Sequence, residues 1–124
     1  MSNAAINTKN TSFDFSENTL ISSYTNLDDN FILMDKDTTL QEKVYKTATL
    51  ISYDKKIKLD VESNYPAIQV YTGQYLKEPF YPKQGICLEP QFCPNSPNFP
   101  NFPYHNTKPD LPLHTKIIYR INEI

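Results

Sequence analysis

The chain has 124 residues, enough for one domain that buries roughly two-thirds of its unfolded surface. It carries 12 Lys and Arg residues against 14 Asp and Glu residues, a formal net charge of −2, and no long basic block. This balance argues against nucleic acid or an anionic membrane as the main partner. The sequence has no apolar run near the ~20 residues that span a bilayer and no N-terminal apolar core typical of a secretory signal. We therefore expect a soluble cytoplasmic protein.

The N-terminal third contains few regular patterns. Residues 1–10 show no periodicity, and we expect them to be disordered or linker-like, which leaves residues 11–124 as the folded part. Phe13 and Phe15 alternate around a polar residue, which favours an extended segment with both rings on one face. A polar, turn-rich stretch precedes a short apolar strand predicted over 31–34, and a further loop is predicted over 35–39.

The middle of the chain has the clearest strand pattern. Residues 47–53 read TATLISY and residues 56–62 read KIKLDVE. In the second segment Ile57, Leu59 and Val61 alternate with charged residues, as expected of an antiparallel strand with one face in water. The short connection at residues 54–55 predicts a hairpin, although it lacks the glycine of the most favourable turns.

Three further strands are predicted after the hairpin, at residues 67–72, 85–88 and 116–122. No window shows a sustained apolar stripe with the 3.6-residue period of a helix. The sequence therefore predicts an all-β, antiparallel fold.

The stretch from Gly85 to Pro103 reads GICLEPQFCPNSPNFPNFP and is the most distinctive in the chain. A short apolar run leads to one carboxylate, Glu89, which five prolines follow within fifteen residues. Because proline fixes φ and removes a backbone donor, we expect this segment to leave regular structure at Glu89 and to continue as a rigid loop. Such loops commonly hold functional side chains on a rigid scaffold.

Four segments stand in a recognisable order along the chain: TSFDF at residues 11–15, LDDNFIL at 27–33, PAIQVYTG at 66–73 and LEPQFCPNSPNFPNFP at 88–103. Together they resemble motifs of the aldose 1-epimerases, also called galactose mutarotases. The resemblance covers the C-terminal part of that family's longer chain. It implies an antiparallel β-sandwich, the family's supersandwich, with a cleft for an aldohexose such as galactose or glucose on one face.

The resemblance also implies roles for three residues. Glu89 matches the general base, which removes the proton from the anomeric hydroxyl of the sugar before the ring opens and recloses on the other face. Asp28 and Gln69 match residues that bind sugar hydroxyls, while Asp29 stands where the family usually has His and is expected to be exposed. Without the resemblance, Glu89 would be a solvated acid at a strand end, Asp28 part of a turn and Gln69 a polar residue on a sheet surface.

The acid of the reaction has no match in this sequence. In the family a His protonates the ring oxygen, and it lies upstream of the matched region together with other sugar ligands. The two histidines here, His105 and His114, follow the Glu89 motif and match neither role. We expect both to be structural or exposed.

Three functions therefore remain open. The chain is a portion of an aldose 1-epimerase that works when an N-terminal half or self-association completes it, or it is a non-catalytic fragment with at most weak sugar binding. The third, ranked lowest, is a hexose-6-phosphate 1-epimerase relative, because phosphate recognition favours cations near the cleft and the sole arginine, Arg120, lies in the last predicted strand.

The two cysteines give no sign of a metal site or a redox pair. Five residues separate Cys87 from Cys93, and this spacing matches neither a zinc nor a redox motif. We interpret Cys87 as a small buried hydrophobic residue and Cys93 as a free thiol. No metal ligand and no cofactor are predicted.

Overall fold

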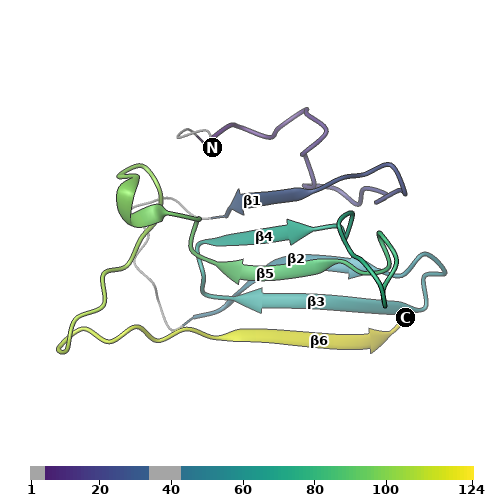
Figure 1. The fold of residues 1–124 in the computed structure, drawn as a ribbon. Helices are drawn as coiled ribbons and strands as arrows, with labels where there is room; N and C mark the ends of the chain where they lie inside the picture. The colour runs from purple at the N-terminus through teal and green to yellow at the C-terminus, as the bar shows by residue number, and fades with distance from the viewer. Residues whose placement is uncertain (1–4, 34–42) are drawn as a thin grey trace.

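The computed structural model of the chain describes residues 5–33 and 43–124. This part of the chain forms two antiparallel sheets of three strands each (Figure 1). The elements in chain order are β1 (Asp28–Ile32), β2 (Tyr45–Ile51), β3 (Ile57–Ser63), β4 (Ala67–Tyr71), β5 (Cys87–Gln91), a 3₁₀ turn η1 (Ser96–Asn98) and β6 (Ile117–Glu123). The predicted all-β antiparallel fold is confirmed.

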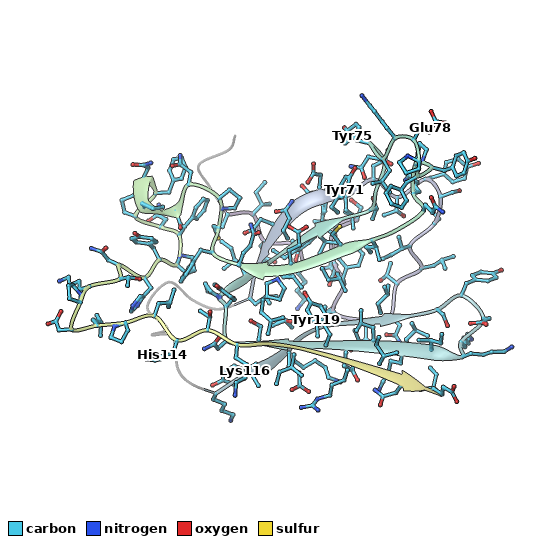
Figure 2. The ribbon with its side chains drawn as sticks, turned by 60° about the horizontal axis from the view of Figure 1, so that its bottom comes forward. Tyr71, Tyr75, Glu78, His114, Lys116 and Tyr119 are labelled. Carbon is cyan, nitrogen blue, oxygen red and sulfur yellow. The ribbon has the colours of Figure 1, made fainter. Side chains whose placement is uncertain are left out.

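The two sheets form two layers. One sheet has the strand order β1-β4-β5 and the other the order β2-β3-β6. Figure 2 shows the first sheet lying over the second, with Tyr119 of β6 directed into the space between them. The Tyr119 hydroxyl donates a hydrogen bond of 2.9 Å to the carbonyl oxygen of Leu88 in β5 and so links the layers.

The predicted hairpin is the connection between β2 and β3. The turn closes through a hydrogen bond of 2.9 Å from the Lys55 backbone N–H to the Ser52 carbonyl. Lys55 adopts a left-handed conformation with φ 57°, which glycine would adopt without strain. The Ser52 hydroxyl oxygen compensates by accepting the backbone N–H groups of Lys56 and Ile57 at 3.2 and 3.0 Å.

The buried core is small. Val61, Ala67 and Ile68 are at most 3% exposed. Toward β6 the apolar side of the second sheet is poorly covered, since Ile121 is 75% exposed and Ile57 is 50% exposed. Apolar residues on the same face of the second sheet therefore differ in burial. Val61 is fully buried, whereas Ile57 and Ile121 are open to solvent.

The N-terminal segment packs against the edge strand β1. A hydrogen bond from the Asp14 N–H to the Thr11 carbonyl closes a turn here, so the prediction of an extended segment was wrong. Both phenylalanine rings nevertheless contact Phe31, with centroids 6.5 Å away for Phe13 and 5.7 Å away for Phe15.

The strand predicted over residues 31–34 begins earlier, as β1 at Asp28. Its last predicted residue and the loop predicted over residues 35–39 lie outside the described residues. The linker-like character of residues 1–10 stays a prediction.

The prediction that regular structure ends at Glu89 was wrong. Strand β5 continues through Glu89 and Pro90 to Gln91, with Pro90 opposite Ile68 of β4. The strand tolerates proline because β5 is at the edge of its sheet, where one side of the backbone has no ladder to maintain. Glu89 is therefore the central residue of a strand.

Candidate functional site

The strand register brings the three sequence-predicted site residues to one face of the first sheet. Gln69 of β4 lies directly opposite Glu89 of β5, and Asp28 of β1 lies opposite Tyr71, two residues after Gln69. Directly opposed residues of antiparallel strands share a face, as do residues two apart in one strand. Asp28, Gln69 and Glu89 thus come from three adjacent strands and share one face, called the polar face below.

Two of the three residues on the polar face, Asp28 and Gln69, contact each other directly. The Gln69 side-chain amide donates a hydrogen bond of 3.0 Å to the Asp28 carboxylate. This bond fixes the amide orientation, so the Gln69 carbonyl oxygen stays available as an acceptor. Asp28 and Glu89 are both exposed, and Gln69 is half-buried between them. The face thus offers two carboxylates and an oriented amide to a polyhydroxylated ligand.

Thr72, the buried residue directly after β4, holds the start of β1 in place. The Leu27 N–H donates to the Thr72 hydroxyl at 2.9 Å, and the Thr72 N–H donates to the Leu27 carbonyl at 3.0 Å. Leu27 and Thr72 are 4% and 5% exposed. This reciprocal pair fixes the position from which Asp28 reaches Gln69.

Cys87 is part of the polar face, and its predicted burial was wrong. It lies two residues before Glu89 in β5, opposite Tyr71, and it is exposed because alternate residues of the strand point away from the other sheet. Local desolvation, the charge of Glu89 and a hydrogen bond to Glu89 all raise the pKa of the Cys87 thiol. Cys93 is a free thiol as predicted, but it is buried.

Two residues of the polar face were missed by the sequence reasoning. Asn30 lies opposite Gln69, and both polar atoms of its side chain are buried without a hydrogen-bond partner among the described residues. Such an unpaired amide is costly and uncommon in a folded protein. Tyr71, opposite Asp28, adds an aromatic ring. The period-two spacing from Asp28 and Gln69 is the signal that could have identified both.

Asp29 does not belong to this face. Its carboxylate accepts the backbone N–H of Asp28 at 3.2 Å, and the residue is half-buried, whereas exposure was predicted. This carboxylate is therefore engaged in a local side-chain-to-backbone hydrogen bond.

Neither histidine belongs to the strands of the polar face. His114 lies just before β6 of the other sheet (Figure 2), and its carbonyl accepts the Asn64 side-chain amide at 2.9 Å. His105 lies in the connection between η1 and β6, and its Nε2 atom is buried without a hydrogen-bond partner among the described residues.

The opposite sheet carries a second acid at the centre of a strand. Asp60 of β3 is 6% exposed, although its side of the strand was predicted to face water. Its carboxylate accepts the Thr49 hydroxyl at 2.6 Å and pairs with Lys46 and Lys58 at 3.0 Å each. The hydrogen bond from Thr49 and those from the two lysines lower the pKa of Asp60 well below its usual value.

The described residues hold no group of three or more His, Cys, Asp or Glu side chains arranged to bind a metal ion. In the same part of the chain, no helix has the length and apolar character needed to cross a membrane.

Comparison with known proteins points to one family. The sequence model of the family described as "Aldose 1-epimerase" matches residues 3–120. Proteins named aldose 1-epimerase from Escherichia coli (strain K12) and from Shigella flexneri are each 37% identical to the chain over 59 residues. That alignment covers 42% of this chain and 17% of each relative, so the matched region is a small part of the relatives' length.

Proposed function

The chain belongs to the aldose 1-epimerase family, and from this membership we propose that its polar face supplies the general base and two sugar ligands of an aldose 1-epimerase site. The substrate class is an aldohexose such as galactose or glucose, whose α and β anomers are interconverted. The observation that carries the proposal is the register: Asp28, Gln69 and Glu89 are far apart in the sequence yet share one face on adjacent strands.

Glu89 is suited to the role of base. Its exposed carboxylate can approach the anomeric hydroxyl to the distance of about 3 Å that proton transfer requires. Loss of that proton lets the anomeric oxygen form a carbonyl while the bond from the anomeric carbon to the ring oxygen breaks. A separate acid must protonate the ring oxygen, and the same steps in reverse close the ring on the other face.

Asp28 and Gln69 are suited to orienting the sugar. A carboxylate can only accept hydrogen bonds from sugar hydroxyls, whereas an amide both donates and accepts. Because the Gln69 amide group already donates to Asp28, its carbonyl oxygen accepts a hydroxyl proton in a fixed direction. Asn30, beside Gln69, has an amide whose hydrogen-bonding capacity is unused among the described residues.

We propose that the acid comes from residues outside this sequence. The incompletely covered apolar side near β6 supports this, because Ile117, Tyr119 and Ile121 are 39%, 52% and 75% exposed. β6 is also at the edge of its sheet, and its outer side pairs with no other strand in the described part of the chain. Open edges and uncovered apolar faces favour pairing with another chain.

A role on hexose 6-phosphates is less well supported. The sole arginine, Arg120, lies on the outer face of the other sheet, where its guanidinium binds the Glu62 carboxylate at 3.0 Å. It is therefore not placed to bind a phosphate at the polar face. The alternative is a purely non-catalytic sugar-binding role. The polarimetry described next distinguishes this role from the epimerase role.

The test is polarimetry of freshly dissolved α-D-galactose. We expect the chain alone to match the buffer rate and a mixture with the N-terminal portion of a family member to exceed it. Glu89→Gln should lower the gain about 10²–10⁴-fold, the usual contribution of a positioned acid or base. The matched control is Glu17→Gln, an exposed acid outside the polar face. A mixture that never exceeds buffer, or a gain that Glu89→Gln leaves intact, overturns the proposal.

A further inference from the structure

The connection between β4 and β5 presents exposed aromatic rings beside the polar face. Tyr75, Phe80 and Tyr81 of this connection are 72%, 57% and 75% exposed. Single exposed rings are common on protein surfaces, but a group of them next to a polar site usually marks a binding surface. Figure 2 shows Tyr75 and Glu78 together at one end of the first sheet, next to Tyr71.

Tyr71 joins these rings to the polar face. Its ring lies nearly parallel to that of Tyr75, with an interplanar angle of 17° and centroids 6.4 Å apart. The Tyr75 backbone N–H donates a hydrogen bond of 2.9 Å to the Tyr71 hydroxyl oxygen. Tyr71 itself lies opposite Asp28 and Cys87. The two rings thus extend the polar face with an aromatic surface, called the tyrosine platform below.

The turn that carries Tyr75 is held firmly. Gly73 has φ 70°, and a Cβ atom at this position would approach the Gly85 carbonyl oxygen to 2.6 Å. The Gly73 carbonyl accepts the backbone N–H groups of Leu76 and Lys83 at 3.3 and 2.7 Å. These bonds fix the start and end of the loop relative to β4. The platform is therefore preorganised, which lowers the entropic cost of binding a ligand.

An aromatic surface beside polar groups is complementary to a pyranose ring. The ring carbons of a pyranose present C–H groups with partial positive charge, and the face of an aromatic ring carries negative charge. Glu78 belongs to the same connection, and its exposed carboxylate can accept hydrogen bonds from hydroxyl groups at the edge of such a ring. Residues 76–82 of the same loop, Glu78 among them, line an open hollow of about 500 Å³.

We propose that the tyrosine platform binds the second ring of a reducing disaccharide whose aldose end is held by Glu89 and Gln69. The inference rests on the proposed function, because the first ring must lie over Glu89 for its anomeric hydroxyl to be deprotonated. Tyr71 adjoins that position, and Tyr75 lies beyond it, past the end of β4. The platform thus selects for a sugar substituent on the aldose rather than for the aldose itself.

The test measures binding of lactose and of galactose to the chain by saturation-transfer NMR titration. We expect Tyr75→Ala to lower the ratio of lactose affinity to galactose affinity about twofold to tenfold, the size of one aromatic contact. Tyr75→Phe keeps the ring and should keep the ratio. Tyr71→Phe keeps its ring but removes the acceptor that holds Tyr75, so it should lower the ratio by a smaller factor. The control is Tyr53→Ala, a 92% exposed tyrosine on the β2–β3 turn.

Different measurements would contradict the platform inference and the proposed function. If Tyr75→Ala and Tyr53→Ala leave the same ratio, or if the chain does not bind lactose, the platform inference is overturned. If Glu89→Gln leaves the polarimetric rate of the completed enzyme unchanged, the proposed function is overturned. Lactose binding that depends on Tyr75 would support the platform even when the mixture shows no catalysis.

Discussion

The outer faces of the two sheets both carry an acid at the centre of a strand, but the two acids differ in their partners. Asp60 is enclosed by one hydroxyl and two ammonium groups. Glu89 is exposed, and the Cys87 thiol is the group among the described residues that contacts its carboxylate. The two acids occupy equivalent positions in their strands, so strand position does not distinguish them. They differ in how much of the hydrogen-bonding capacity of each carboxylate is already used.

The same contrast extends to the neighbours of each acid. Around Asp60, the Glu62 carboxylate is also occupied, by Arg120. Around Glu89, the Asn30 amide has no partner among the described residues, and Gln69 keeps a free acceptor. One face is a closed network that stabilises the sheet, and the other is an open set of groups available to a ligand. Substitutions on the two faces should therefore act on different properties.

The largest effect on stability is expected at Asp60. Its partners lower its pKa in the folded state below the ordinary 3.8, so its contribution to stability is full above about 3.8 and is lost as the pH falls toward the lowered value. Asp60→Asn should lower the melting temperature near neutral pH and flatten its decline in acid. Circular dichroism melts across this range provide the measurement.

The control for Asp60 is Asp110→Asn, an exposed loop acid whose loss should leave the acid profile of the wild-type chain in place. An Asp60→Asn chain that declines in acid as steeply as the wild type would show that another group is responsible.

A smaller effect is expected at Thr49, the hydroxyl donor to Asp60. Thr49→Val keeps the shape of the side chain and removes one hydrogen bond to a charged group, which should destabilise the fold by about 1–2 kcal/mol. Urea unfolding gives the free energy. Thr49→Ser retains the donor and should recover most of the loss; equal losses for valine and serine would assign the effect to packing.

The smallest effect on stability is expected at Glu89, the residue that we propose as the catalytic base. Glu89→Gln removes a charge from an exposed position whose carboxylate has few partners, so the free energy of unfolding should change by less than about 0.5 kcal/mol. The same urea titration tests this. A loss comparable to that of Asp60→Asn would mean that Glu89 is a structural acid, and the comparison between the two faces would no longer hold.

Much of the fold could be predicted because its strands follow simple local rules. The β2–β3 hairpin and β4 combine alternating or apolar β-favouring residues with short turns, and both were placed within a few residues. The end of β5 was misplaced because proline is unfavourable in a strand unless one edge is free. Edge position depends on strand order, and strand order depends on contacts between segments distant in the sequence.

The site could be predicted only as far as the family motifs reach. Asp28, Gln69 and Glu89 were predicted from their motifs, and the register shows that they share a face, while their roles stay a proposal. Asn30 and Tyr71 were missed because their period-two spacing from Asp28 and Gln69 indicates only a shared strand face, and the pairing of β1 with β4 is needed to bring the two strands together. Asp60 was expected to be solvated, because alternation indicates which side of a strand a residue occupies but not which partners cover it.

The edge strands of the two sheets also differ, and this difference affects how readily the chain aggregates or is degraded in a cell. β5 contains Pro90, which lacks a backbone N–H, and β2 has an irregular register between Lys46 and Ala48. Both features hinder strand addition. β6 is a seven-residue strand with no proline and a regular register. Growth by strand addition is thus favoured at β6. A chain whose outer β6 edge stays open would be a preferred substrate for aggregation and for quality-control proteases.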